Sequence, residues 1–151
     1  MATIYLAGER PAIVAPLHYN SAGIYYEQDA PLTVGIRNAV ELASHLRVAL
    51  GRFSFREEDL RMQKMSDWSS YRASGLKSAK GFEDVYLRVQ VRAVNEAELL
   101  FEASAKPSGE ADIALSVLLN PFADDEEIGR LLGRLNDACL RWSSVVNEIR
   151  S

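Results

Sequence analysis

The chain has 151 residues, of which 48% are hydrophobic and 25% are charged. This balance is typical of a globular domain and excludes an intrinsically disordered chain. Two domains within this length would each be smaller than usual, so we expect one domain that spans residues 1–151. A domain of this size buries enough surface to fold without disulfides or a structural metal.

The formal net charge is −4. Domains that bind nucleic acid through its phosphates usually carry an excess of Lys and Arg, so direct nucleic-acid binding is not expected and a basic partner fits better. Cys139 is the only cysteine, which excludes an intramolecular disulfide and fits a reducing compartment. We find no signal peptide and no apolar stretch long enough to span a bilayer, so we expect a cytoplasmic protein without membrane contact.

The first thirty residues predict short strands. Apolar runs at residues 4–9 and 12–16 are the clearest candidates, and residues 23–28 are a third. Pro11 and Pro16 lack the N–H group that a strand donates to its neighbour, so we expect them at strand ends or on an edge strand.

From residue 32 the apolar side chains recur every three or four positions, which predicts an amphipathic helix over residues 32–53. Thr33 is the expected N-cap, and Gly51 is the expected stop signal. The predicted buried stripe consists of Ile36, Ala39, Val40, Ala43, Leu46 and Leu50.

Residues 54–66 are rich in charge and show no clear period. Ser54 and Glu57 have the spacing of a capping box, which would begin a short helix. A charged loop explains the segment nearly as well, so both alternatives stay open at this point.

Three strands are predicted in quick succession, at residues 85–93, 98–105 and 112–119. Apolar side chains alternate along them, which indicates strands with one face on a core. The connections are too short for crossover helices, so the strands form an antiparallel meander. The side chains expected in the core are Val85, Leu87, Val89, Val91, Ala93, Leu99, Phe101, Ala103, Ala105, Ile113, Leu115, Val117 and Leu119.

The chain closes with a long predicted helix over residues 124–149, which would lie across the sheet and cover its apolar face. Its stripe consists of Ile128, Leu131, Leu132, Leu135, Cys139, Trp142, Val145, Val146 and Ile149. Together the elements predict an α+β fold. An antiparallel β-sheet, made of the meander of three C-terminal strands plus the N-terminal strands, carries a helix from the N-terminal half and the long C-terminal helix.

The sequence contains no recognisable catalytic, cofactor-binding or metal-binding constellation, so we expect neither an enzyme nor a cofactor. His18 and His45 are the only histidines, and no serine lies in a nucleophile-elbow pattern. Cys139 falls on the apolar stripe of the last helix, which favours structural burial. Residues 67–86 contain Lys77 near two glycines but lack the spacing of a phosphate loop. We interpret them as a solvated connector, with a nest-like anion site as the minor alternative.

Two acidic groups are candidates for contact with a basic partner. The group at the head of the last helix also interacts favourably with the helix dipole, and both groups aid solubility. The candidate partner-binding residues are Glu57, Glu58, Asp59, Asp67, Asp124, Asp125, Glu126 and Glu127.

Two further features are ambiguous. The polar face of the strand at residues 85–93, which includes Arg88 and Arg92, is either a solvated surface or a binding face. Trp68 and Tyr25 are either interface aromatics or the rim of a core.

Spaced residues in the middle of the chain carry a family resemblance. The sequence from residue 32 onward resembles the immunity proteins of bacterial contact-dependent growth inhibition systems, in its order of elements and in single residues of the central segment. The residues that carry the resemblance are Val34, Gly35, Ile36, Trp68, Tyr71, Gly75, Lys77, Ser78, Lys80, Phe82 and Glu83.

The resemblance implies a cytoplasmic protein that binds the toxic C-terminal domain of a cognate effector, commonly a nuclease, and blocks its active site sterically. It implies no enzymatic activity, and it implies that the shared segment maintains the fold without needing to touch the toxin. Basic nuclease surfaces attract an acidic inhibitor, which fits the net charge here.

Two alternatives remain. One is a small enzyme or ligand-binding domain that uses the sheet face, against which the missing acid/base pairs argue. The other is a nucleic-acid-binding module that uses Arg88, Arg92, Lys77 and Lys80, against which the negative net charge argues.

Overall fold

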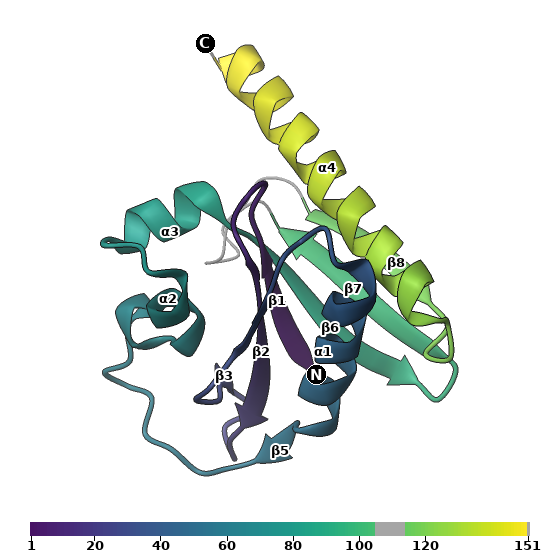
Figure 1. Ribbon diagram of the computed structural model, residues 1–151. Helices are drawn as coiled ribbons and strands as arrows, with labels where there is room; N and C mark the ends of the chain where they lie inside the picture. Colours follow the sequence, from purple (N-terminus) through teal and green to yellow (C-terminus); the bar gives the residue numbers. More distant parts are fainter. Residues whose placement is uncertain (105–113, 151) are drawn as a thin grey trace.

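The computed structural model describes the backbone of residues 1–104 and 114–150, and the side chains of these residues other than 114, 139, 140 and 142–150. Within these residues one eight-stranded sheet packs against helices (Figure 1), so the predicted α+β class is confirmed. The elements are β1 (Ala2–Leu6), β2 (Ala12–Tyr19), β3 (Tyr25–Glu27), β4 (Leu32–Val34), α1 (Ala39–Gly51), β5 (Ser54–Phe55), the 3₁₀ turn η1 (Met65–Asp67), α2 (Ser69–Ser74), α3 (Ala79–Val85), β6 (Leu87–Asn95), β7 (Glu98–Ser104), β8 (Ala114–Leu119) and α4 (Asp125–Arg150).

The strands lie in the order β3-β2-β1-β6-β7-β8, and neighbours in this order are antiparallel. β6, β7 and β8 are the predicted meander, and the pairing of β1 with β6 joins the meander to the N-terminal strands. β4 also pairs with β2, and the short β5 pairs with β2 in parallel, with Ser54 opposite His18. Both halves of the sequence therefore contribute to one sheet.

β2 continues through Pro16, although the sequence placed this proline at a strand end or on an edge strand. That prediction was wrong, because Pro16 lies inside β2 and β2 is not at the edge of the sheet. The proline is tolerated here because the pairing of β2 with its outer neighbours is interrupted at this position. β3 ends opposite Leu17 and β4 begins opposite Val14, so the proline faces the gap between two edge strands. Its carbonyl oxygen still accepts a hydrogen bond from the backbone N–H of Gln28 at 2.8 Å.

α1 begins later than predicted. Asn38 is the N-cap, and its Oδ1 accepts a hydrogen bond from the backbone N–H of Glu41 at 3.2 Å. Thr33 lies in β4 instead, because strand pairing with β2 outweighs the helical spacing of residues 32–34. The buried stripe is rotated accordingly, and Val40 is 54% exposed. The buried residues of α1 are Leu42, Ala43, Leu46 and Ala49.

α1 and α4 cover one face of the sheet and enclose the larger hydrophobic core. The predicted inward side chains of β6 and β7 are buried in it, with two exceptions: Ala93 is exposed, and Val85 ends α3 instead of beginning a strand. Leu115, Val117 and Leu119 of β8 pack against the same core. The predicted core residues Ala105, Ile113, Cys139, Trp142, Val145, Val146 and Ile149 have side chains that lie outside the described residues.

Close packing and one arginine fix the start of α4 to α1. A Cβ atom on Gly129 would overlap the carbonyl group of Ala39, so the two helices approach here only because residue 129 lacks a side chain. The guanidinium of Arg47 donates to Asp125 Oδ1 at 2.7 Å and to two carbonyl oxygens in the turn before α4. Beyond this contact α4 extends past the end of the sheet (Figure 1).

The opposite face of the sheet is covered by residues 67–86, which the sequence presented as a solvated connector. That prediction was wrong, because these residues form α2 and α3 on the side of β1 and β2 away from α1 (Figure 1). Phe82 is fully buried there, with its ring centroid 5.2 Å from that of Tyr5 and 5.0 Å from that of Tyr86. The middle of the sheet is therefore buried on both faces.

Candidate functional site

The segment between β5 and η1 is a charged loop, so the second of the two sequence alternatives holds. Ser54 caps no helix. It lies in β5, and its Oγ is 3.0 Å from Nδ1 of His18. The loop begins after β5, which pairs with the end of β2, and leads to η1 and α2. Its acidic residues therefore lie beside the second face of the sheet, which is the face that α2 and α3 cover.

Hydrogen bonds from other residues hold the acidic side chains of this loop in place. Glu57 accepts two hydrogen bonds from Ser21, one from its backbone N–H and one from its hydroxyl group, both at 3.1 Å. Asp59 lies 2.6 Å from the guanidinium of Arg61, whose hydrogen bonds lower the pKa of this carboxyl group. These carboxylates are exposed but fixed, so they present charge at defined positions.

The other two predicted acids of this group differ in how firmly they are held. Asp67 Oδ2 accepts a hydrogen bond from the backbone N–H of Lys64 at 2.8 Å and closes η1. Glu58 forms a long ion pair, with 3.9 Å between its Oε2 and Nε of Arg56. Burial, followed by the charge of Glu58, raises the pKa of Tyr26, and a side-chain hydrogen bond with Glu58 adds to this shift.

The second acidic group serves the start of α4. Asp124 Oδ1 accepts a hydrogen bond from the backbone N–H of Glu127 at 2.7 Å, which caps the helix. Asp125 pairs with Arg47, and Glu126 lies 3.6 Å from Arg130 one turn further on. Local helix capping and packing against α1 therefore explain much of this group.

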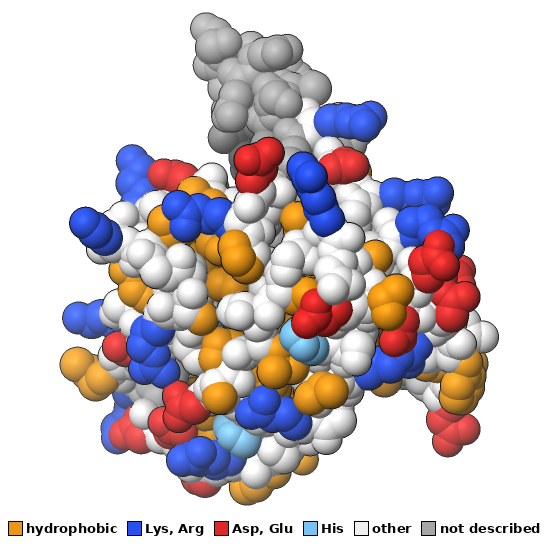
Figure 2. All heavy atoms as spheres, viewed as in Figure 1, with side chains coloured by type: hydrophobic (Ala, Val, Ile, Leu, Met, Phe, Trp, Pro, Cys, Tyr) orange, Lys and Arg blue, Asp and Glu red, His pale blue; other side chains and the backbone are white. Residues whose placement is uncertain are grey.

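The structure does not bring the two acidic groups together. The loop follows β5 near the β3 edge of the sheet, whereas α4 starts after β8 at the opposite edge. Figure 2 shows acidic side chains at the lower left, below α2, and again at the right, beside the start of α4. A small partner domain would meet one group or the other.

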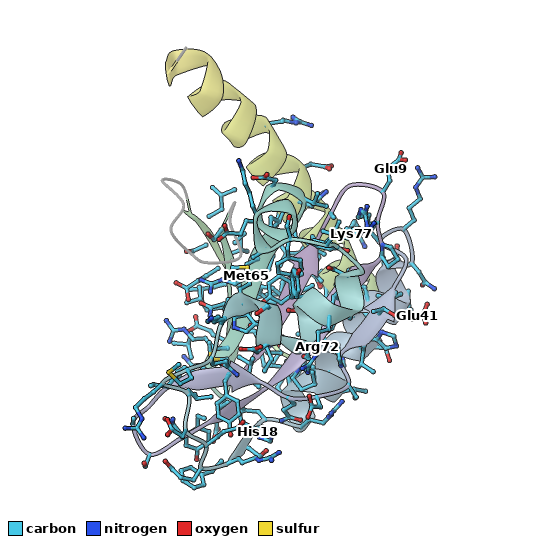
Figure 3. The ribbon with its side chains drawn as sticks, turned by 90° about the vertical axis from the view of Figure 1, so that its left-hand side faces the viewer. Glu9, His18, Glu41, Met65, Arg72 and Lys77 are labelled. Carbon is cyan, nitrogen blue, oxygen red and sulfur yellow. The ribbon has the colours of Figure 1, made fainter. Side chains whose placement is uncertain are left out.

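Three adjoining hollows open beside the acidic loop, and Trp68 and Gln63 line all of them. The smallest, of about 130 Å³, reaches the strand surface at Arg88. The second, of about 280 Å³, is lined by Glu58 and Asp67 among others. Figure 3 views this side of the molecule, with Met65 and Arg72 in the layer over the sheet and His18 below them.

The third hollow, of about 760 Å³, lies between the loop and the turn that connects β2 and β3. Glu57, Glu58 and Asp59 line it on one side, and Ile24 lines it on the other. Three of the predicted acidic residues therefore border one concave surface.

Glu27 lines two of these hollows, and the sequence did not indicate it. It is half-buried on β3, and its carboxylate accepts four hydrogen bonds. The hydroxyl of Tyr5 donates one at 2.7 Å, Ser69 Oγ donates one at 3.0 Å, and the backbone N–H and hydroxyl of Ser70 donate two at 2.8 and 2.7 Å. Burial, followed by the charge of Glu27, raises the pKa of Tyr5 well above 10.0. This carboxylate fastens α2 to the sheet.

A row of exposed aromatic side chains lies beside the acidic loop. The ring of Tyr19 is 5.2 Å from that of Phe53 and 5.4 Å from that of Phe55, and Phe53 is 6.1 Å from Tyr25. Phe55 and Tyr25 are 55% and 52% exposed. Of these rings the sequence pointed only to Tyr25, because Tyr19, Tyr25 and Phe55 come from separate strands and Phe53 comes from the turn before β5. We define the acidic–aromatic surface as Tyr19, Ile24, Tyr25, Phe53, Phe55, Glu57, Glu58 and Asp59.

The residues of the central segment that carried the family resemblance lie in the layer formed by η1, α2 and α3 over the second face, whereas Val34 and Ile36 contact the larger core. Trp68 and Tyr71 pack against the same cluster as the buried Phe82. Gly75 takes φ +67° at the C-cap of α2, and Ser78 Oγ caps α3 by accepting the N–H of Gly81 at 3.0 Å. Each of these residues has a structural role.

No protein-family model matches the sequence, and a search of curated proteins finds no match. Among solved structures the chain is similar to NMB0488 from Neisseria meningitidis, a protein of unknown function, with a TM-score of 0.68 and 20% identity over 91% of this chain and 93% of that one. It is also similar to a chain of the CdiA-CT/CdiI toxin and immunity complex from Yersinia pseudotuberculosis, with a TM-score of 0.61 and 11% identity over 91% and 95% of the two chains. At these identities the likeness is one of fold.

Across the described residues, every helix is too short or too polar to cross a bilayer. The described His, Cys, Asp and Glu side chains nowhere gather in threes at metal-binding distances.

Proposed function

We propose that this protein is an immunity protein that binds and neutralises the toxin domain of a contact-dependent growth inhibition effector. The observation that carries the proposal is the fold similarity over 91% of this chain to a chain of a toxin and immunity complex. The resemblance of the central segment to such immunity proteins points to the immunity side of that pair. We further propose that the toxin domain is a nuclease and that the protein acts in the cytoplasm.

The proposed mechanism is steric occlusion, without chemistry by this protein. The acidic–aromatic surface is the part that we propose docks on the toxin. Aromatic side chains that are exposed in the free protein supply large contact area at a low entropic cost, and such residues dominate binding energy in interfaces. The row from Phe55 to Tyr25 offers several of them together.

The fixed carboxylates beside this row would orient the toxin domain on the surface and raise the rate of association. Nuclease surfaces are basic where they meet phosphates, so acidic groups at defined positions raise the association rate and disfavour wrong partners. The ion pair of Glu58 with Arg56 is long, at 3.9 Å, and we propose that Glu58 pairs with a basic side chain of the toxin. Asp124 and Asp125 at the start of α4 are occupied with capping and with Arg47, so we assign these two no contact.

The nucleic-acid alternative gains no support from the positions of its arginines. Arg92 pairs with Glu102 at 3.4 Å, and Arg88 lines the small hollow beneath Trp68. Arg92 is exposed but already paired with a carboxylate, and Arg88 is only partly exposed, so the two do not form a basic stripe that would follow a phosphate backbone.

Co-expression tests the proposed function in cells. The toxin domain encoded immediately upstream of this gene is induced alone and together with this protein, and growth is followed. The proposal predicts that growth stops in the first strain and continues in the second. Continued killing in the presence of well-expressed, folded protein would remove the proposal.

A further inference from the structure

The smallest hollow of the candidate site ends at an arginine that forms no ion pair with the described residues. Arg88 is the second residue of β6 and lies opposite Tyr5 of β1. Its neighbours Leu87 and Val89 are buried in the core under α1 and α4, so the alternation along the strand directs Arg88 to the other face of the sheet. There it lines a cavity of about 130 Å³ below Trp68.

Arg88 lacks a hydrogen-bonding partner among the described residues. Its Nε atom is buried and has no acceptor, and none of the ion pairs in the described residues includes its guanidinium. A buried donor without an acceptor costs free energy, which an incoming acceptor would recover. A ligand that places an acceptor atom at Nε of Arg88 would therefore bind favourably.

Glu27 lines the same cavity but does not satisfy this arginine. Its two oxygens already accept four hydrogen bonds, from Tyr5, Ser69 and Ser70. These donors occupy the acceptor positions of Glu27, so Glu27 forms no hydrogen bond with Arg88, whose guanidinium lines the cavity.

The remaining walls favour a small planar anion. The side chains of Gln63 and Gln90 line the cavity and can each donate through an amide group, and Trp68 provides an aromatic wall. The cavity is well below the size of typical nucleotide or drug pockets, so the ligand has few atoms. A guanidinium matches a carboxylate through two parallel hydrogen bonds. A doubly charged phosphate would meet stronger repulsion from Glu27.

We propose that this cavity is a carboxylate-binding site in which Arg88 holds the ligand. The site is independent of toxin neutralisation and would exist whether or not that function holds. The carboxylate comes either from a small free acid or from an Asp or Glu side chain of a bound protein, and both sources present the same group to Arg88.

Nuclear magnetic resonance of the full ¹⁵N-labelled chain tests the proposal directly. The Nε–H signal of Arg88 and the indole N–H signal of Trp68 are followed while sodium acetate replaces sodium chloride at constant ionic strength and pH. A second titration uses the amide of N-acetylaspartate, which imitates an acidic side chain, and a third uses inorganic phosphate. We expect saturable shifts of both signals with acetate, with the aspartate derivative, or with both, and not with phosphate alone.

Two matched variants distinguish carboxylate binding at Arg88 from general effects of the added salt on the spectrum. Arg88→Lys keeps the charge but loses the paired hydrogen bonds, so the apparent carboxylate affinity read from Trp68 should fall by about tenfold. Arg92→Lys, on the same strand and the same face, should leave the affinity unchanged. Acetate alone identifies a small free acid as the source, and a response to the aspartate derivative admits a protein side chain. Absence of saturation with both carboxylates, a response to phosphate only, or an Arg88→Lys response equal to that of the parent would overturn the proposal.

Discussion

The hydroxyl group of Tyr5 donates a hydrogen bond of 2.7 Å to Oε1 of Glu27, and this contact connects the interior strand β1 to the edge strand β3. The same carboxylate holds the start of α2 through Ser69 and Ser70. One side chain therefore joins three elements that are far apart in the sequence, and it does so at the wall of the candidate site. Tests of this contact show how firmly the layer over the second face is attached.

Replacing Glu27 with Gln should destabilise the protein by about 1–3 kcal/mol, because a neutral amide accepts fewer and weaker hydrogen bonds from the same donors. Urea unfolding followed by circular dichroism measures the change in the free energy of unfolding. Asp29→Asn is the matched control: its carboxylate is 88% exposed and pairs only with the exposed Arg72, so the expected loss is below about 1 kcal/mol. Equal losses for the two variants would contradict the role given to Glu27.

Tyr5→Phe should make stability less dependent on pH in the alkaline range. The pKa of Tyr5 is raised well above 10.0 in the folded protein, mainly by burial and then by Glu27. Its contribution is therefore fully present below pH 10.0 and is lost as the pH rises toward the folded-state pKa. We expect the parent to be more stable than Tyr5→Phe at pH 8 and the difference to shrink steadily above pH 10.0. A difference that stays constant up to pH 11 would show that Tyr5 ionises equally in both states.

Two glycines of α4 should respond to alanine in opposite directions. Gly129→Ala should cost about 1–3 kcal/mol, because the new methyl group overlaps Ala39 and pushes α4 away from α1. At Gly133 a Cβ atom would meet nothing within 4 Å, so Gly133→Ala should stabilise the helix by about 0.5–1 kcal/mol. Thermal and urea unfolding of both variants measure the two effects. Similar signs for both would contradict the close approach of the helices.

If the acidic–aromatic surface docks on the toxin domain, truncating its rings should weaken the complex. Tyr25→Ala and Phe55→Ala should each lower the affinity by roughly 10- to 30-fold, which corresponds to about 1.4–2 kcal/mol. Phe122→Ala is the control, because Phe122 is 86% exposed but lies before α4, beyond the opposite edge of the sheet. Isothermal titration calorimetry with the toxin domain measures all three. A larger loss of affinity from Phe122→Ala than from the other two variants would contradict docking through the acidic–aromatic surface and would place the interface at the β8 edge of the sheet.

The acidic loop should act chiefly on the rate of association. Neutralising Glu57, Glu58 and Asp59 together, as Gln, Gln and Asn, should slow association with a basic toxin domain and reduce its dependence on salt. Glu126→Gln with Glu127→Gln is the control at the start of α4 and should change neither quantity appreciably. Stopped-flow measurements at several salt concentrations give both. A salt dependence unchanged by the loop substitutions would exclude the loop from steering.

The sequence predicted the meander and the closing helix because their side chains repeat regularly and each element buries one face. It mistook residues 32–34 for the start of a helix, because spacing alone does not reveal a strand partner such as β2. It also missed α2 and α3, which are too short to show a helical period. α3 is stabilised by capping by Ser78 and by burial of Phe82 against the sheet, and α2 is held by the hydrogen bonds from Ser69 and Ser70 to Glu27.

The candidate site was predicted only in part, for a similar reason. Glu57, Glu58 and Asp59 stand next to one another in the sequence and were therefore visible as a group. The sequence indicated Arg88 only as part of a polar strand face and did not indicate Glu27, and the pairing of β3 with β2, of β2 with β1 and of β1 with β6 brings both of them to one cavity. Long-range strand pairing therefore creates the part of the site that the sequence does not display.

The central claim is that this protein inhibits a toxin by covering its active site. The most direct measurement adds the purified protein in increasing amounts to the purified toxin domain encoded upstream and follows the activity of that domain on its substrate. The account predicts that activity falls in proportion to the protein added and vanishes once the toxin domain is saturated. A toxin domain that stays fully active in the presence of a large excess of folded protein would contradict it.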